Sequence, residues 1–227
     1  MTTHLQREIE NLKKKILYMS AEVEESLRNA VESLVKRDPK LAQQVIDSDN
    51  TMDHLEVEIE EECLKILALH QPVAVDLRFV VAVLKINSDL ERIGDLAVNI
   101  AERAGYLATH DPLDLPLDFK GMAKLVQGML SQSIDCLVNS DTQLARLVRA
   151  SDDGVDDMNR LMYTIIQDYI RDHPDRVTES IHLLSAVRHL ERIADQATNI
   201  AEDVIYMVEG EIVRHQAEDF SGGTPTS

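Results

Sequence analysis

The chain of 227 residues is 44% hydrophobic and 28% charged, which allows one large domain or two small ones. Its 4% of aromatic residues, 8 glycines and 6 prolines are few for a fold of strands and turns, so the composition favours long helices packed through aliphatic side chains. The 41 acidic and 23 basic residues give a formal net charge of −18, which argues against nucleic acid or an anionic membrane surface as a partner and favours divalent cations and basic protein surfaces.

Helical periodicity begins near the N-terminus, where apolar residues recur every three or four positions from residue 5 to residue 34. The pair Asp38-Pro39 is typical of a helix start, and His70-Gln71-Pro72 is a break between helices. Further helices are separated by stretches rich in proline or turn residues. The sequence therefore predicts six helices, at about 5–34, 39–70, 73–108, 119–138, 142–172 and 174–218.

An internal repeat organises these helices into two sets of three. Residues 90–102 read LERIGDLAVNIAE and residues 190–202 read LERIADQATNIAE, so the two segments differ at only three positions. Residues 48–53 (SDNTMD) and 151–156 (SDDGVD) are also similar and precede them in each half. We therefore expect an all-α protein of two tandem three-helix bundles, over residues 1–110 and 119–218, with a linker at 111–118 and a disordered tail at 219–227.

The repeat carries acidic residues at helical spacing. Each half has an acidic pair four residues apart on one helix and a second pair, followed by an asparagine, on the next helix. At about 100° per residue, such positions share one helix face. The candidate ligands are Asp49, Asp53, Glu91, Asp95 and Asn99 in the first half, and Asp152, Asp156, Glu191, Asp195 and Asn199 in the second.

Oxygen ligands of this kind suit iron, manganese, magnesium or calcium, and carboxylates from facing helices can hold two metal ions in a bundle. A solvated helix face is the alternative, since an acidic i,i+4 pair costs only about 0.2–0.5 kcal/mol. Two observations favour metal binding. The duplicated segments keep the acids, and the same helix face is apolar upstream, at Leu77 and Leu84 and at Val177 and Leu184.

Two enzyme motifs compete with this interpretation. Asp152-Asp153-Gly154-Val155-Asp156 matches the DDxxD of pyrophosphate-handling terpenoid synthases, but a chain without Trp is a poor candidate for their aromatic pockets. Glu179 and His182 match the Glu-x-x-His of di-iron bundles, which need the motif twice. We interpret His182 as a surface histidine. A metal-independent helical adaptor is the third alternative.

The remaining features predict a soluble cytoplasmic protein. Cys63 and Cys136 form no CxxC pair and are expected to be buried small hydrophobes. The N-terminal segment has no apolar signal region, and the apolar runs are too short to cross a bilayer.

Several segments together resemble the PhoU family, regulators of phosphate transport in bacteria and archaea. They are QPVAVDLR at 71–78, LERIGD at 90–95, LERIAD at 190–195 and TNIAEDVIYMVEG at 198–210. The resemblance covers nearly the whole chain up to Gly210 and implies a fold of two three-helix bundles.

The resemblance also implies a function, because the family carries E(D)xxxD motifs that bind multinuclear metal clusters. All eight acidic positions named above fit these motifs. The metal would be iron first, with zinc, manganese, nickel, magnesium or calcium as alternatives. Related proteins are not enzymes but negative regulators of the phosphate-starvation response. They are thought to form homodimers, to contact the phosphate ABC transporter ATPase and its sensor histidine kinase, and to meet the membrane only through these partners.

Overall fold

A computed structural model describes residues 3–211, and within this range it is built from helices without strands. The long helices are α1 (Thr3–Lys36), α2 (Pro39–His70), α3 (Ala74–Ala108), α4 (Phe119–Asn139), α5 (Thr142–Asp172) and α6 (Val177–Glu209). A short 3-10 turn, η1 (Pro174–Arg176), joins α5 to α6. The all-α prediction is confirmed.

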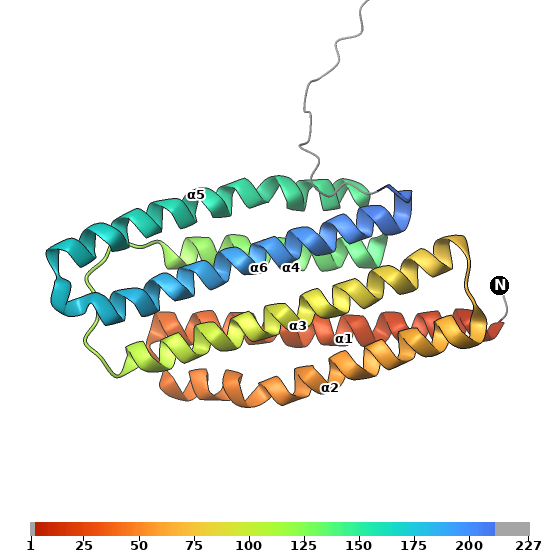
Figure 1. The fold of residues 1–227 in the computed structure, drawn as a ribbon, viewed down its shortest axis with the longest axis horizontal. Coiled ribbons are helices and arrows are strands. Elements are labelled where there is room, and N and C mark those ends of the chain that lie inside the picture. The colour runs from red at the N-terminus through yellow and green to blue at the C-terminus, as the bar shows by residue number, and fades with distance from the viewer. Residues whose placement is uncertain (1–2, 212–227) are drawn as a thin grey trace, which may run out of the picture.

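The helices form two bundles that lie side by side (Figure 1). Helices α1, α2 and α3 pack together in the first bundle, and α4, α5 and α6 in the second. The bundles meet where α3 packs along α6 and α1 packs against α4. As Figure 1 shows, α2 and α5 lie on opposite outer sides of the molecule. The prediction of two three-helix bundles is therefore confirmed.

One apolar core runs through both bundles. The stripe predicted along the first helix is buried, with Leu12, Met19 and Leu27 fully inaccessible to solvent. Small residues, such as Ala101 on α3 and Ala201 on α6, are buried in the central helices and allow their backbones to approach closely. Both cysteines are buried and unbridged, as predicted.

Three of the helices begin at aspartate caps. The Asp38 side chain accepts hydrogen bonds from the backbone N–H groups of Lys40 and Leu41 at 2.9 and 3.2 Å, ahead of Pro39 in the first turn. Asp118 caps α4 and Asp141 caps α5 in the same way. Each cap provides acceptors for N–H groups that have no partner within the helix.

The end of α6 corrects one prediction. The last helix was expected to reach residue 218, but it ends at Glu209. Gly210 follows with a φ of 76°, and its N–H donates to the Tyr206 carbonyl at 2.9 Å. Glycine adopts this left-handed conformation without strain and so ends the helix. The rest of the expected helix, from residue 212, and the predicted tail at 219–227 lie outside the described residues.

The two bundles are joined by a buried charge at one place along the α3–α6 contact. Lys85 Nζ lies 3.1 Å from Asp203 Oδ1, and the Asp203 side chain is almost completely buried. The same ammonium group lies over the Tyr206 ring, 5.5 Å from its centroid. A charge-assisted bond of this kind fixes the register of two helices as well as their contact.

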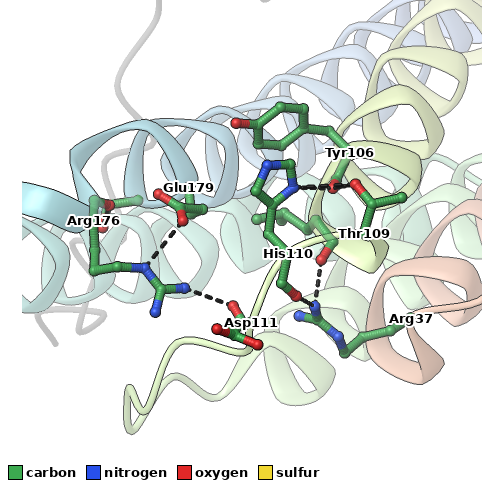
Figure 2. A network of polar contacts seen from close by, with 9 residues as sticks. Arg37, Tyr106, Thr109, His110, Asp111, Arg176 and Glu179 are labelled. Carbon is green, nitrogen blue, oxygen red and sulfur yellow. Dashed lines mark hydrogen bonds and ion pairs between the residues drawn. The ribbon is translucent and has the colours of Figure 1, made fainter.

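Two arginines hold the start of the interbundle linker (Figure 2). Arg37 Nη2 donates to the carbonyl of Leu107, in the last turn of α3, and to that of His110, just beyond its end. Arg176 Nη2 donates to the Asp111 carbonyl at 2.6 Å, and its Nε pairs with Glu179 at 3.0 Å. One arginine comes from each bundle, so the linker start is bound by both. No helix among residues 3–211 is long and apolar enough to cross a bilayer.

Candidate metal sites

The first candidate site lies on the contact between α2 and α3. We call Asp49, Asp53, Glu91 and Asp95 the first acidic cluster. Between its two helices, a Cβ placed on Gly94 would lie 3.3 Å from Met52 Cγ, so the backbones approach closely beside the acids. The helical spacing then places the two acidic pairs on the facing sides of neighbouring helices.

The carboxylates of the first acidic cluster repel one another. Burial, together with the negative charges of Asp95, Glu56 and Asp53, raises the pKa of Glu91 to about 7. Burial also raises the pKa of Asp49, with added repulsion from Asp53 and Asp95. Charges on α2 therefore act on charges on α3 across the contact between the two helices.

The second acidic cluster repeats this arrangement between α5 and α6, with Asp152, Asp156, Glu191 and Asp195. Burial, together with the negative charges of Asp195, Asp156, Asp153 and Glu191, raises the pKa of Asp152 to about 6. Burial, repulsion from Asp156 and attraction by Arg192 together leave the pKa of Asp195 raised. In each half, the four predicted acids act on one another electrostatically across a helix contact.

The asparagines lie one turn beyond the acids. Asn99 Nδ2 donates to the Asp95 carbonyl at 2.8 Å, so its amide is bound to its own helix. Asn199 is half-buried at the matching place on α6. Within residues 3–211 no three His, Cys, Asp or Glu side chains converge closely enough to enclose a metal ion. Metal binding would require the carboxylates to rotate towards each other.

The upstream faces are less buried than expected. Leu84 and Leu184 pack against the core, as predicted. Leu77 and Val177 stand near the starts of their helices and are 40% and 38% exposed. The prediction that this helix face is buried is therefore confirmed one heptad before each glutamate, and it is wrong two heptads before each glutamate.

The single Glu-x-x-His motif has a structural role. Glu179 pairs with Arg176, and the His182 ring stacks on Tyr106 of α3 at a centroid distance of 3.8 Å. His182 is therefore an interhelical contact and not the surface residue that the sequence indicated.

Two residues beside the first acidic cluster were missed from the sequence. Glu56 is half-buried one turn after Asp53, and burial raises its pKa with added repulsion from Glu60, Asp53 and Asp95. Asn87 lies one turn before Glu91 and donates from Nδ2 to the Glu56 carbonyl at 2.9 Å. Helical spacing from the predicted acids could have found both. A comparison of the two repeats does not indicate them, because the second repeat has Asn159 and Val187 at these places.

Comparison with known proteins agrees with this architecture. The family model described as PhoU domain matches the chain twice, over residues 16–104 and 119–204. The chain belongs to the PhoU family. Each matched segment contains one acidic cluster, so the family's repeat unit coincides with the repeat that carries the acids.

Relatives of the chain are named for phosphate transport. A protein of Aquifex aeolicus named phosphate-specific transport system accessory protein PhoU homolog is 42% identical over 210 residues, which is 92% of this chain and 95% of the relative. A Pseudomonas aeruginosa protein with the same name is 36% identical over 209 residues, 92% of this chain and 86% of that protein.

Solved PhoU structures have the same fold. The crystal structure of PhoU from Pseudomonas aeruginosa matches with a TM-score of 0.87 at 35% identity, over 91% of this chain and 99% of that one. The phosphate transport system regulatory protein PhoU from Streptococcus pneumoniae matches with a TM-score of 0.83 at 27% identity, over 92% and 99%.

Proposed function

We propose that this PhoU-family chain is a metal-dependent accessory protein of a phosphate transport system, acting as a negative regulator through protein contacts and not as an enzyme. The observation that carries the metal dependence is the electrostatic coupling within each acidic cluster, where burial and mutual repulsion raise the pKa of several carboxyls at once. The transport role is supported by the names of relatives that match over nine-tenths of the chain.

The donor set fits hard or borderline divalent cations and iron. Every candidate side chain offers carboxylate or amide oxygen, the ligand type that such ions prefer. The first ion or cluster would be held by Asp49, Asp53, Glu91 and Asp95, with Asn99 one turn further. The second would be held by Asp152, Asp156, Glu191 and Asp195, with Asn199 in the matching place. Bound cations would supply the positive charge that offsets the repulsion within each cluster.

The chain's own residues would couple such binding to the molecular surface. Each cluster joins an outer helix to a central one, α2 to α3 and α5 to α6. Neutralising the acids would let the outer helices settle against the central pair, which Lys85 and Asp203 hold in register. The outer helices would then present one fixed surface to a partner, and would be less ordered without cations.

The outer helices offer apolar side chains for protein contacts. Exposed large hydrophobic residues lie along both of them, among them Val57, Leu64 and Leu69 on α2, and Leu147, Leu161 and Tyr163 on α5. The partners we propose from the family resemblance are the ATPase of a phosphate ABC transporter and a sensor histidine kinase, with a homodimer as the assembled form. The regulation would lower phosphate uptake and the starvation response in the cytoplasm.

The test compares the metal content of wild type with that of Asp95→Ala/Asp195→Ala. Both proteins are incubated with iron, manganese, zinc or magnesium, passed through gel filtration without chelator and measured by elemental analysis. We expect metal in wild type and a sharp loss in the variant. Equal and negligible contents in both would refute the metal dependence and leave the acids as solvated helix faces. Turnover of a phosphorylated substrate that disappears in the variant would refute the assignment as a regulator.

A further inference from the structure

An apolar groove opens between the two bundles at one end of the molecule. Its walls come from the first half of α1, the first turn of α3 and the last turns of α4 and α6, which gather at the same end in Figure 1. The cavity has a volume of about 430 Å³, within the range of about 300–1,000 Å³ over which protein pockets hold ligands. The acids of the two clusters do not line it, so this surface is separate from the candidate metal sites. We call it the interbundle groove.

Each wall of the interbundle groove leaves a large apolar side chain open to solvent. The four residues are between 36% and 59% exposed, and they are Leu17 on α1, Val75 on α3, Val138 on α4 and Val208 on α6. Phe79 also lines the cavity but is buried. Several exposed apolar side chains around one cavity mark a surface that binds another apolar group.

The chain leaves α6 at the rim of this groove. Met207 and Val208 line the cavity, and Gly210 ends the helix directly after them. Arg78 on α3 fixes this exit, because its Nε donates to the Met207 carbonyl at 3.0 Å and its guanidinium lies 3.7 Å from the position of a Cβ on Gly210. The segment after Gly210 therefore starts beside the first turn of α3, which supplies Val75 to the groove.

That segment carries apolar side chains suited to the groove. Residues 212–220 lie outside the described residues, and their sequence is IVRHQAEDF. Ile212 and Val213 come directly after the exit, and Phe220 ends the segment. An aromatic side chain such as phenylalanine contributes about 150–250 Å² of buried surface, more than any other apolar residue of the segment. Phe220 is therefore the strongest candidate to fill the cavity.

The charges of the groove and of the segment are complementary. Asp76 lines the groove near the exit, and Arg214 comes early in the segment. Lys13 lines the groove on α1, and the acidic residues 218–219 come late in the segment. Lys13 also pairs with Glu10 at 3.4 Å, but that pair is exposed and contributes little, so the ammonium group is available to a second carboxylate. Complementary charges of this kind fix the direction in which a segment binds.

The segment is also long enough. Gln6 and Leu17 are at the two ends of the groove along α1 and are about 16 Å apart, at about 1.5 Å per helical residue. The chain from Gly210 to Phe220 extends over at most about 33 Å, so Phe220 can reach every part of the cavity. Because the segment is attached at the rim, its effective concentration there is about millimolar, and even a weak contact is populated.

We propose that the interbundle groove binds the C-terminal segment of the same chain, residues 212–220, with Phe220 in the cavity beside Phe79 and Arg214 next to Asp76. The segment would cover the exposed apolar residues of all four walls. A partner protein that binds this end of the molecule would first have to displace it. The proposal does not depend on the metal function, because it rests on a different surface.

The test uses the complete chain of 227 residues, which contains no tryptophan. Phe220→Trp therefore adds a single fluorescent reporter to the segment. We expect its emission to lie to the blue of tryptophan in water and its quenching by acrylamide to be several-fold weaker. Adding Val138→Glu, which places a charge in the groove wall, should move the emission to that of tryptophan in water. Leu161→Glu is the matched control, because Leu161 is an exposed leucine on α5 that does not line the groove, and it should leave the emission unchanged.

Three results would overturn the proposal. The first is emission like that of tryptophan in water from the Phe220→Trp protein, which would show that the segment does not bind. The second is a blue-shifted emission that Val138→Glu leaves unchanged, which would show that the segment binds elsewhere. The third is a blue shift that disappears on dilution, which would assign the segment to the groove of a second copy. Circular dichroism melting checks that each variant is folded.

Discussion

Met52 on α2 and Gly94 on α3 face each other beside the first acidic cluster, where a Cβ on Gly94 would lie 3.3 Å from Met52 Cγ. The second repeat has Val155 and Ala194 at the same places, and both are fully buried. The first repeat thus pairs a large residue with glycine and the second pairs a smaller residue with alanine, so the combined volume of the two side chains is similar in both repeats. The spacing between the helices that carry the acids depends on this pairing.

Gly94→Ala is expected to change the free energy of unfolding by less than about 1 kcal/mol. The gain in helix propensity is about 1 kcal/mol, and it is offset because Met52 must move by a few tenths of an ångström. Met52→Val alone should cost about 1 kcal/mol through the space it leaves. The double variant combines a smaller residue at position 52 with alanine at position 94, as in the second repeat. Its free energy of unfolding should be higher than the sum of the two single changes gives. Urea unfolding of the four proteins measures this coupling, and strict additivity would contradict it.

The free energy of unfolding of the metal-free protein should fall as pH rises from about 5 to 8. Glu91 has a folded pKa of about 7 against an ordinary value of 4.5, so the folded state holds its proton more tightly. Its favourable protonation is lost as pH rises through the folded pKa. Asp152, with a pKa of about 6 in place of 3.8, acts in the same direction at lower pH.

The Glu91→Gln variant separates the effect of Glu91 on the pH dependence of stability from the effects of groups that act in the opposite direction. Burial lowers the pKa of His189 to about 4, so that histidine destabilises the fold as pH falls below about 6.5. The variant should match wild type at pH 5, exceed its stability at pH 8 and show a flatter fall between them. Urea unfolding at each pH measures the difference. Parallel curves for the two proteins would show that Glu91 does not titrate in this range.

The fold could be predicted from sequence because its signals are local and repeated. The stripe through Leu12 and Met19 gives the first helix its period, and the duplicated segments at 90–102 and 190–202 indicate two equivalent bundles. The end of α6 could not be predicted in this way, because apolar residues continue in the sequence past Gly210. Only the left-handed conformation of that glycine shows that the helix stops there.

The candidate sites could be predicted only where the two repeats agree. Comparison of the halves selects Glu91 and Glu191 because both repeats have glutamate at this place. It does not select Glu56 and Asn87, because the second repeat has Asn159 and Val187 at the corresponding places. Side-chain rotation is also invisible in a sequence. The acids share a helix contact as expected, yet no three of them converge in the described part of the chain.

Arg37→Met should loosen the start of the linker. The change removes the two hydrogen bonds to the carbonyls of Leu107, in the last turn of α3, and His110, just beyond its end. A bond from a charged donor contributes about 1.5–3 kcal/mol, so we expect a loss of about 2 kcal/mol for the whole protein. Hydrogen exchange at residues 107–118 should become faster. Lys36→Met is the control, because Lys36 is exposed and pairs within its own helix with Glu32. Unchanged exchange in the Arg37 variant would contradict the contribution of this contact.

Asn87→Val should make the metal-free protein more stable by about 1 kcal/mol, because it removes a buried acceptor without a partner. The Glu56 carbonyl loses the Asn87 bond but keeps the bond of its own helix. The reverse change, Val187→Asn, should cost about 2 kcal/mol by burying an unsatisfied amide. Urea unfolding measures both changes, and a less stable Asn87→Val protein would show that the bond from Asn87 to the Glu56 carbonyl outweighs the unsatisfied acceptor.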